Sequence, residues 1–549
     1  MKETIHVIAY DIGTTSVKTC LFSVSEDRVT LLASAAADYP ITVLPNGGAE
    51  QNPDDWWLAM CRTTRETIKK SGFSPQEIDG LSFCSQMQAL VLVDKEGRHV
   101  RPAMSYMDQR AANEMKEGLQ YGLKIEGANV YKLLRSLVIT KAAPTSVKDP
   151  VWKYKWVEKH EGENFARVYK WLDVKEAIIC RCTGEFIMTR DSAYATLLYD
   201  TRKGKNKFSR DMCKLFGVDF NHLPAVISSD AEAGKLTKNA AEELGLAEGT
   251  PVFGGGGDAA LVGVGAGATA AGATHIYVGT SGWVSTVVEK QMVDTNARIA
   301  AIVGADKTFN YFAEMETAGK CLEWVRDHLA LDEIGIYLEK YLQTDSPEPP
   351  IERVITSEGS PLESVHVSLY GYLIESIENV APGCDGVLFA PWLHGNRCPF
   401  EDGEVKGVFF NIGIETGKSK LIRAVLEGVC FHLRWMLEAQ GKKITLPDTL
   451  RFVGGGALAP FTCQLLADIT GKTVQTVENP QNAGAAGAAL LAAVGLKKIP
   501  SINYAEKMIK PNAEYIPNKT LKAVYDKNYS AFQMLYKNNK KTFHLLNSI

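Results

Sequence analysis

The sequence predicts an α/β protein with at least two domains. Its 549 residues exceed what one hydrophobic core normally supports. Apolar, β-branched segments alternate with segments of helical spacing, which is typical of α/β architecture. A strand–turn–strand pattern also occurs twice, at residues 5–24 and 274–290. Each half of the chain is therefore expected to carry a similar hairpin, as after an internal duplication.

The first half is expected to open with the hairpin at residues 5–24, because apolar and β-branched residues flank a Gly-centred turn. Asn52 and Pro53 then provide a helix start, and residues 56–71 have helical spacing. Residues 78–100 repeat the order of strand, loop and strand.

The second half follows a change of composition near residues 250–280, where a strand leads into four glycines and a helix of small residues. We place the boundary there, which divides the chain into domains of residues 1–264 and 265–549. From about Lys497 the chain is rich in Lys and Asn, with Tyr and Leu at helical spacing. A solvated peripheral helix is expected there.

Composition excludes several classes of protein. The 60 basic and 64 acidic residues are interleaved and give a net charge of -4, so no nucleic-acid partner is expected. Eleven scattered cysteines lack the spacing of a zinc site and are typical of buried, reduced thiols. The N-terminal residues lack a signal-peptide pattern, and a cytoplasmic location is expected.

One uncharged stretch, residues 259–288, is long enough to span a bilayer. It consists mainly of Gly, Ala, Thr and Ser, with few Leu, Ile or Phe. We interpret it as a buried glycine-rich turn between secondary elements, so no membrane partner is expected.

The turn of the first hairpin has the residues that a phosphate site needs. Backbone N–H groups beside Gly13 can approach a phosphate, and the hydroxyls of Thr14 and Thr15 add donors. Asp11, at the end of the strand, can hold magnesium, usually through water. A plain hairpin with an Asx-turn explains the same residues.

Two further glycine segments suit a nucleotide. Gly279 and Thr280 repeat the phosphate pattern in the second hairpin, although such turns are common. Residues 454–457, Gly-Gly-Gly-Ala, lie between a strand and a helix start, which allows close backbone approach. A tight strand-to-helix turn is the alternative. Neither the G-x-G-x-x-G spacing nor the P-loop spacing occurs, which argues against a Rossmann oxidoreductase. Asn482 opens a small-residue helix that could pack against an adenine or simply against a sheet.

The glycines at 254–257 leave the carboxylate of Asp258 without side-chain cover. A sugar hydroxyl is a poor nucleophile, and a carboxylate poised at its proton can accept that proton during phosphoryl transfer. Asp258 is equally suited to be the N-cap of the following helix, and the two roles are compatible.

The order of these four motifs resembles the FGGY carbohydrate kinases of the actin/hexokinase-like ATPase superfamily. The likeness runs from about Ile5 to Gly495 and includes TGEF at 183–186, EVKGVFFNI around Gly407, RAVLEGV at 423–429 and LADITG at 466–471. The last segments look particularly like xylulokinases.

The resemblance implies an α/β fold of two ribonuclease-H-like, actin-like ATPase domains with a central cleft that closes on substrate. It makes the first domain sugar-binding and the second ATP-binding, with Asp258 as catalytic base and Asp11 at the Mg²⁺-phosphate end. The implied ATP contacts are Thr14, Thr15, Gly279, Thr280, Gly455, Gly456, Ala457 and Asn482.

The sugar end departs from the xylulokinase pattern. Met87, Gln88 and Asp108 are the implied substrate contacts, with Asp258. Xylulokinases resemble G-Q-M-H-G where this chain has S-Q-M-Q-A, so Gln88 replaces a sugar-contacting His. Asn commonly follows the catalytic Asp in that family, and this chain has Ala259. The usual Trp-x-Asp-x-Arg loop begins with Tyr106.

The expected activity is ATP- and Mg²⁺-dependent phosphorylation of a small sugar or polyol, xylulose or a related pentulose. Alternatives are ribulose, erythritol or glycerol as substrate, or a non-catalytic actin-like ATPase or sugar sensor. The exposed position expected for Asp258 favours the kinase. The sequence leaves the oligomeric state open, a homodimer included.

Overall fold

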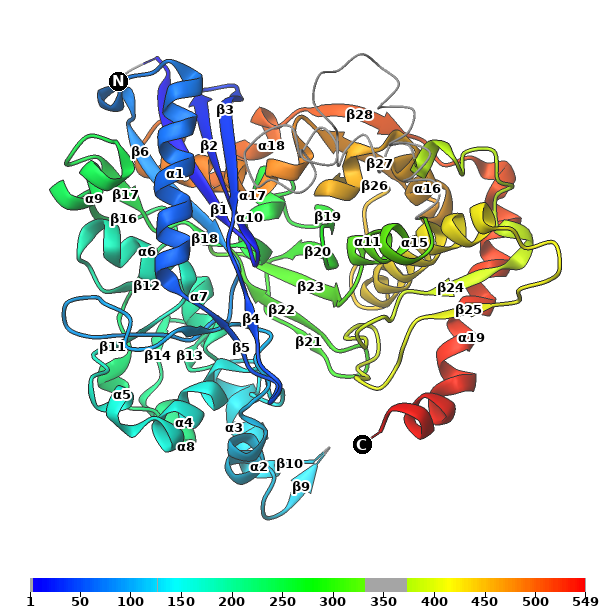
Figure 1. Cartoon of the computed structure of the whole chain (residues 1–549), viewed down its shortest axis with the longest axis horizontal. Coiled ribbons are helices and arrows are strands. Elements are labelled where there is room, and N and C mark those ends of the chain that lie inside the picture. The colour runs from blue at the N-terminus through cyan, green and yellow to red at the C-terminus, as the bar shows by residue number, and fades with distance from the viewer. Residues whose placement is uncertain (1–2, 126, 331–372, 549) are drawn as a thin grey trace.

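The computed structural model describes residues 3–125, 127–330 and 373–548. Two large β-sheets, each covered by helices, form two lobes (Figure 1). The first lobe is built on strands that precede Gly265, and the second on strands that follow it. The prediction of an α/β fold with two lobes is confirmed.

The first sheet has the strand order β16-β17-β6-β1-β2-β3, and β18 also pairs with β6. Its strands are β1 (Ile5–Ile12), β2 (Ser16–Val24), β3 (Val29–Asp38), β6 (Gly80–Ser85), β16 (Glu232–Lys235), β17 (Pro251–Phe253) and β18 (Gly256–Gly257). Strands β1, β2 and β3 are antiparallel neighbours, whereas β6 runs parallel to β1. The expected hairpin at residues 5–24 is present as β1 and β2.

The second sheet repeats this arrangement. Its order is β21-β22-β23-β20-β19-β26-β27-β28. The strands are β19 (Thr274–Val278), β20 (Gly282–Val288), β21 (Val293–Asp294), β22 (Ile299–Val303), β23 (Phe309–Met315), β26 (Thr449–Val453), β27 (Thr473–Val477) and β28 (Pro511–Tyr515). Strands β19, β20 and β23 are antiparallel, and β26 runs parallel to β19. The two halves therefore share a core of three antiparallel strands that continues into parallel strands, and each core begins with the predicted hairpin.

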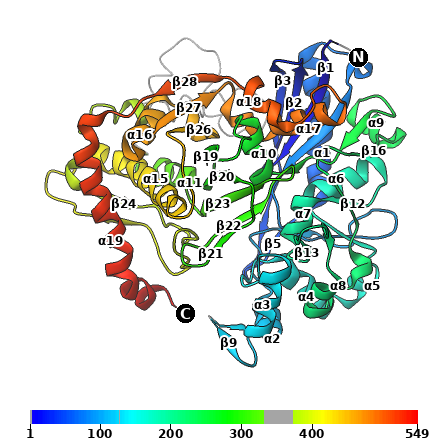
Figure 2. The same cartoon turned by 180° about the vertical axis from the view of Figure 1, so that it is seen from behind.

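Helices from distant parts of the chain cover the two faces of the first sheet. Helix α1 (Pro53–Ser71) starts at the predicted cap, where the Asn52 side chain accepts a hydrogen bond from the Asp54 N–H. Its residues Trp56 and Trp57 join the core on one face. On the other face lie α10 (Asp258–Gly265) and α17 (Ala483–Gly495), as Figure 2 shows.

Small residues allow α17 to cross from the second half of the chain onto the first sheet. A Cβ added at Gly265 would lie 1.8 Å from the Ala483 carbonyl oxygen, and one at Gly487 would lie 2.3 Å from that of Leu261. Helices α10 and α17 therefore touch backbone to backbone between the lobes. The small-residue helix at Asn482 packs on a sheet, one of the two alternatives that the sequence left open.

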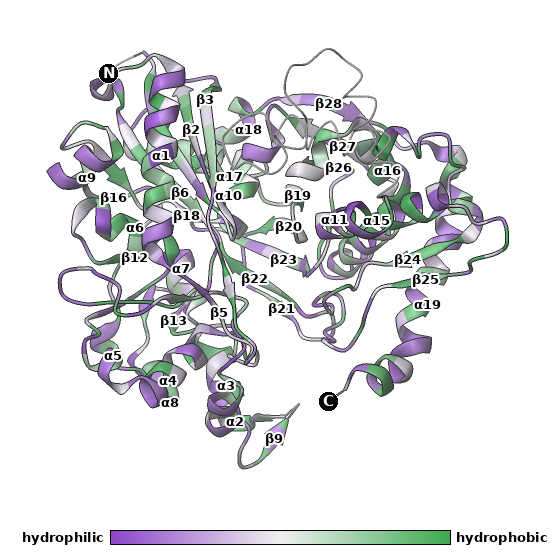
Figure 3. Cartoon of the chain, viewed as in Figure 1, coloured by the Kyte–Doolittle hydropathy of each residue, from purple (hydrophilic) through white to green (hydrophobic). Residues whose placement is uncertain are grey.

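The second sheet is covered by α11 (Gly319–His328), α15 (Lys418–Gly441) and α16 (Pro460–Thr470). Helix α19 (Lys522–Asn547) takes the place of the predicted peripheral helix. It is amphipathic (Figure 3): Tyr525, Tyr529 and Phe532 are buried in the core of this lobe, and its lysines face outward. The segment between Lys497 and α19 forms α18 (Ala505–Met508) and β28.

Residues 39–250 add smaller elements to the first lobe. The strands are β4 (Thr42–Val43), β5 (Ala49–Gln51), β7 (Val91–Val93), β8 (Ala103–Met104), β9 (Lys124–Ile125), β10 (Ala128–Asn129), β11 (Lys170–Leu172), β12 (Ile187–Thr189), β13 (Tyr199–Asp200), β14 (Lys207–Phe208) and β15 (Ala225–Ile227). The helices are α2 (Ala112–Leu119), α3 (Val130–Ile139), α4 (Pro150–His160), α5 (Gly162–Ala166), α6 (Val174–Thr183), α7 (Arg190–Ala195), α8 (Arg210–Phe216) and α9 (Lys238–Leu244). Strands β24 (Leu388–Ala390) and β25 (Val408–Phe410) form a separate antiparallel pair in the second lobe.

The uncharged stretch at residues 259–288 forms α10, β19 and β20 rather than a single turn. Among the described residues, no helix has both the length and the apolar character that crossing a membrane requires. All eleven cysteines are free thiols, and all but the half-buried Cys61 are buried, as predicted.

Candidate active site

Two carboxylates lie at the same edge of the first sheet. Asp11 is near the end of β1, and Asp258 follows β18 directly. Both strands flank β6: Asp11 is opposite Cys84 in one pairing, and Gly256 is opposite Cys84 in the other. Because these strands are parallel, their carboxyl ends meet at one edge and bring the two predicted functional residues together.

The glycine run has a steric reason. Gly255 has φ +65°, and a Cβ there would lie 2.1 Å from the Phe83 carbonyl oxygen. At Gly257 a Cβ would lie 2.0 Å from Met87 Sδ. Helix α10 begins at Asp258 itself, and Gly257 occupies the N-cap position. The N-cap interpretation of Asp258 was therefore wrong by one position, although its carboxylate still accepts a hydrogen bond of 2.7 Å from the Ala259 N–H.

The surroundings of Asp258 favour its protonated form. Burial raises its pKa to about 7, and the negative charges of Asp11, Glu314 and Asp173 add to the shift, against the hydrogen bond from Ala259. Burial also raises the pKa of Asp11, and the charge of Lys18 opposes that shift. Asp258 is half-buried and can exchange a proton near neutral pH, as a general base requires.

Two side chains hold the first hairpin turn in place by donating hydrogen bonds to its backbone carbonyl oxygens. The Tyr39 hydroxyl donates to the carbonyl oxygens of Gly13 (2.5 Å) and Ser16 (3.0 Å). The Gln51 side-chain amide donates to the Thr14 carbonyl oxygen at 2.7 Å. The Thr15 side chain is exposed and Thr14 is half-buried. The turn is thus fixed in place while its hydroxyls remain accessible.

The second hairpin and the Gly-Gly-Gly turn are adjacent. A Cβ at Gly456 would lie 2.7 Å from Val278 Cγ1, so the turn packs directly on β19. The Gly279 carbonyl oxygen accepts a hydrogen bond of 2.8 Å from the Gly319 N–H at the start of α11. Gly455 is exposed and its Cβ position meets nothing within 4 Å. Gly279, Thr280, Gly455 and Gly456 thus form one partly exposed surface of the second lobe, and Ala457 is buried next to them.

Asn482 lies next to this surface. The Gly454 N–H donates to the Pro480 carbonyl oxygen at 2.9 Å, which ties the Asn482 segment to the glycine turn. Asn482 also lines a pocket of about 350 Å³, together with Arg28 and Lys510. Gly484, two residues further along, lies close to Asp11: a Cβ on Gly484 would lie 3.3 Å from Asp11 Oδ2.

The predicted sugar loop has an unusual backbone. Gln88 has φ +64°, and its N–H donates to Asp173 at 2.8 Å while its carbonyl accepts from Lys153 Nζ at 2.8 Å. Burial lowers the pKa of Lys153 to about 8, against the opposing charges of Asp108, Asp173 and Asp149. The loop is therefore pinned through its backbone, and Met87 is held against Gly257, beside Asp258.

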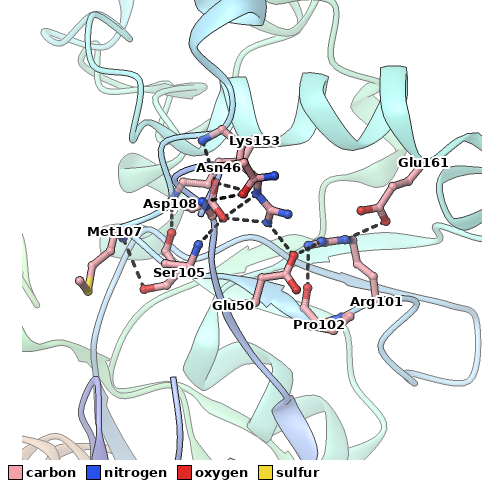
Figure 4. Close-up of polar contacts among 12 residues, drawn as sticks. Asn46, Glu50, Arg101, Pro102, Ser105, Met107, Asp108, Lys153 and Glu161 are labelled. Atoms are coloured by element: carbon pink, nitrogen blue, oxygen red, sulfur yellow. Dashed lines mark hydrogen bonds and ion pairs between the residues drawn. The ribbon is translucent and has the colours of Figure 1, made fainter. Parts of the chain in front are cut away.

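Asp108, one of the predicted sugar contacts, is buried in this structure. Its side chain is fully buried, pairs with Arg110 at 2.7 Å, and accepts a hydrogen bond of 2.9 Å from the Ala49 N–H. Figure 4 shows Asp108 within a polar network that extends through Glu50 and Arg101 to Glu161. This carboxylate supports the loop that carries Tyr106 and is not open to a ligand in this structure.

Sequence reasoning missed three residues around Asp258. Tyr106 is hydrogen-bonded to Thr14, and the charges of Glu314, Asp258 and Glu316 raise its pKa in addition to burial. Tyr277 stacks on Trp283, with ring centroids 3.9 Å apart, and the charges of Asp11 and Asp258 act on its hydroxyl. Tyr106 could have been found as the first residue of the variant loop. Tyr277 lies in the first strand of the second predicted hairpin, of which only the turn residues were considered, and Glu314 belongs to no motif that the sequence analysis identified.

Comparison with known proteins agrees with this geometry. The family model described as FGGY family of carbohydrate kinases, N-terminal domain, matches residues 6–265, and the model for the C-terminal domain of that family matches residues 275–496. A xylulose kinase of Bacillus subtilis is 28% identical over 97% of this chain and 96% of its own length. A gluconokinase of the same organism is 26% identical over 94% and 92%.

Solved structures share the fold. The ligand-bound xylulose kinase of Lactobacillus acidophilus superposes with a TM-score of 0.81 at 21% identity, covering 99% of this chain and all of the other. The two-lobed arrangement is thus that of an FGGY carbohydrate kinase.

Proposed function

The chain belongs to the FGGY family of carbohydrate kinases, and we propose that it transfers the γ-phosphoryl group of ATP to a hydroxyl of xylulose or a related pentulose. The observation that carries this proposal is the position of Asp258. It directly follows Gly257, which packs against Met87, and it lies at the same sheet edge as Asp11. Its pKa of about 7 suits proton transfer.

In the proposed reaction, the sugar hydroxyl lies against Asp258 and the triphosphate lies along the two hairpin turns. Asp258 accepts the hydroxyl proton as the sugar oxygen bonds to the γ-phosphorus and the bond from that phosphorus to the β–γ bridging oxygen breaks. ADP and the sugar phosphate are the products. Thr14, Thr15, Gly279, Thr280, Gly455, Gly456, Ala457 and Asn482 are proposed to hold the nucleotide.

Asp11 suits the phosphate end. No group of three metal-ligating side chains occurs among the residues described. Mg²⁺ in phosphoryl-transfer sites, however, usually takes one or two carboxylates and completes its shell with phosphates and waters. The half-buried carboxylate of Asp11 fits this pattern. When bound, Mg²⁺ would neutralise charge that develops on the phosphates, and Asp11 would hold it there.

The proposal keeps the division into a sugar-binding part, residues 1–264, and an ATP-binding part, residues 265–549, in a cytoplasmic enzyme. Helix α17 qualifies that division, because it lies on the first sheet. Ribulose, erythritol and glycerol remain alternative substrates, and the gluconokinase relative adds gluconate. A coupled assay of ADP release with each of these compounds tests the proposal. Absence of ATP turnover with every one would favour the non-catalytic alternative.

The choice among sugars is expected to depend on Gln88. A neutral amide offers a donor and an acceptor at a different reach from imidazole, and a mismatched buried polar contact costs ~1–3 kcal/mol. Gln88→His should therefore change the ratio of kcat/KM between two sugars by roughly tenfold, and with it their ranking. The KM for ATP should stay nearly unchanged. An unchanged ranking would limit Gln88 to supporting its loop.

The pH profile is expected to follow Asp258. The base works only when it is deprotonated. The kcat/KM for the sugar should therefore be low in acid and rise with pH, with a midpoint near 7. Glu314→Gln removes one of the negative charges that raise this pKa, so its midpoint should move to lower pH. A profile that is flat between pH 5.5 and 8 would contradict the role of Asp258 as base.

A further inference from the structure

Strand β23 presents one face toward Asp258. Trp283 is opposite Tyr277 in the pairing of β19 with β20, and Glu314 is opposite Trp283 in that of β20 with β23. The three side chains therefore form a row on one face of the second sheet. Asn310, on the same face, donates to the Ala259 carbonyl oxygen at 2.9 Å. This face thus packs on α10 directly after Asp258.

Glu314 and Glu316 add negative charge to the sugar end. The charge of Glu314 acts on Asp258, and the charges of Glu314, Glu316 and Asp258 all act on Tyr106. Tyr106 belongs to the predicted sugar loop. Both glutamates come from the second lobe, whereas Tyr106 and Asp258 come from the first. The negative charges of three carboxylates from two lobes thus act on this tyrosine.

The cations at this end are already engaged. Arg397 pairs with Glu314 at 2.9 Å, and Lys148 of the first lobe pairs with Glu316 at 3.5 Å. Lys153 donates to the backbone carbonyl oxygens of Gln88 and Ser105, both at 2.8 Å. None of these three cations is left to neutralise a carboxylate on a substrate.

We propose that Glu314 and Glu316 restrict the sugar site to uncharged polyhydroxy compounds and exclude aldonates such as gluconate. This inference rests on the proposed kinase function and narrows its substrate class. Hydroxyl groups can donate hydrogen bonds to carboxylates. A carboxylate substrate would have to compete with Glu314 for Arg397 or with Glu316 for Lys148, because these two cations are already paired.

The test compares D-xylulose with D-gluconate by initial rates of ADP release. Wild type is expected to prefer xylulose in kcat/KM by ~100-fold or more. Glu316→Gln and Glu314→Gln each free a cation that can pair with the substrate carboxylate, and each should raise the gluconate-to-xylulose ratio by ~10-fold. Glu289→Gln, an exposed glutamate that follows β20, should leave the ratio unchanged.

Two results would overturn the inference: a wild-type preference for gluconate, or a ratio that both glutamine variants leave unchanged. Calorimetric binding of the two compounds to wild type needs no variant and no turnover. If ADP release fails with every sugar, the proposed function fails. Tighter binding of xylulose than gluconate would still support the charge selectivity, whereas equal binding or tighter binding of gluconate would refute it.

Discussion

Replacement of Asp258 by Asn is expected to lower kcat for the best sugar by ~10²–10⁴-fold, the usual contribution of a positioned general base. The amide has the size of the carboxylate but cannot accept the hydroxyl proton. Nucleotide affinity should be retained, because the triphosphate is proposed to bind at the two hairpin turns. Steady-state ADP release and calorimetry with ADP measure the two effects.

A stability measurement separates loss of the base from misfolding. The folded-state pKa of Asp258 is raised to about 7 from 3.8, so the folded protein binds this proton more tightly than the unfolded chain. The resulting stability is present at low pH and is lost as pH rises through 7. Asp258→Asn should therefore melt at a higher temperature than wild type at pH 8, with a smaller difference at pH 5.

Asp211→Asn is the matched control, since Asp211 pairs with Arg135 on the surface of the first lobe. It should change neither turnover nor the pH dependence of melting. Wild-type turnover in Asp258→Asn would remove Asp258 from the role of base.

Replacement of Asp11 by Asn is expected to lower kcat/KM by ~10–100-fold and to raise the Mg²⁺ concentration needed for half-maximal rate. The neutral amide is a weaker ligand for a hard cation than the carboxylate. Sugar binding should persist, because the loop of Met87 and Gln88 is held by Asp173 and Lys153 rather than by Asp11.

Titration with Mg²⁺ at saturating sugar and calorimetry of sugar binding measure the two sides of this prediction. Asp38→Asn provides the control, because Asp38 is an exposed residue at the end of β3. Loss of sugar binding with unchanged Mg²⁺ dependence would place Asp11 at the sugar instead.

The sequence by itself determined the features that have a local physical cause. Apolar, β-branched residues on both sides of glycine turns predicted the hairpins around Gly13 and Gly279, since strand propensity and turn chemistry act over a few residues. Asn52 predicted the start of α1 for the same reason. The family followed from the order of motifs that include Asp11 and Asp258, and the two family matches confirm it.

The tertiary structure alone decided which side chains face one another. Asp108 was predicted at the sugar, and in the fold its buried side chain accepts a hydrogen bond from the N–H of Ala49, a residue distant in sequence. For the helix that Asn482 opens, the sequence left packing against an adenine or against a sheet open, and only the fold shows that α17 lies on the first sheet. No local pattern distinguishes these outcomes.

The position of Glu314 is the clearest example of a feature that only the tertiary structure decides. Along the chain it is one acidic residue in an alternating strand, and nothing near it in sequence indicates a ligand. Its place near Asp258 follows from the registers of β23 on β20 and of β20 on β19 and from the packing of that face on α10. Strand register and lobe contacts depend on residues far apart in the chain, so charge arrangement at the site is a property of the folded molecule.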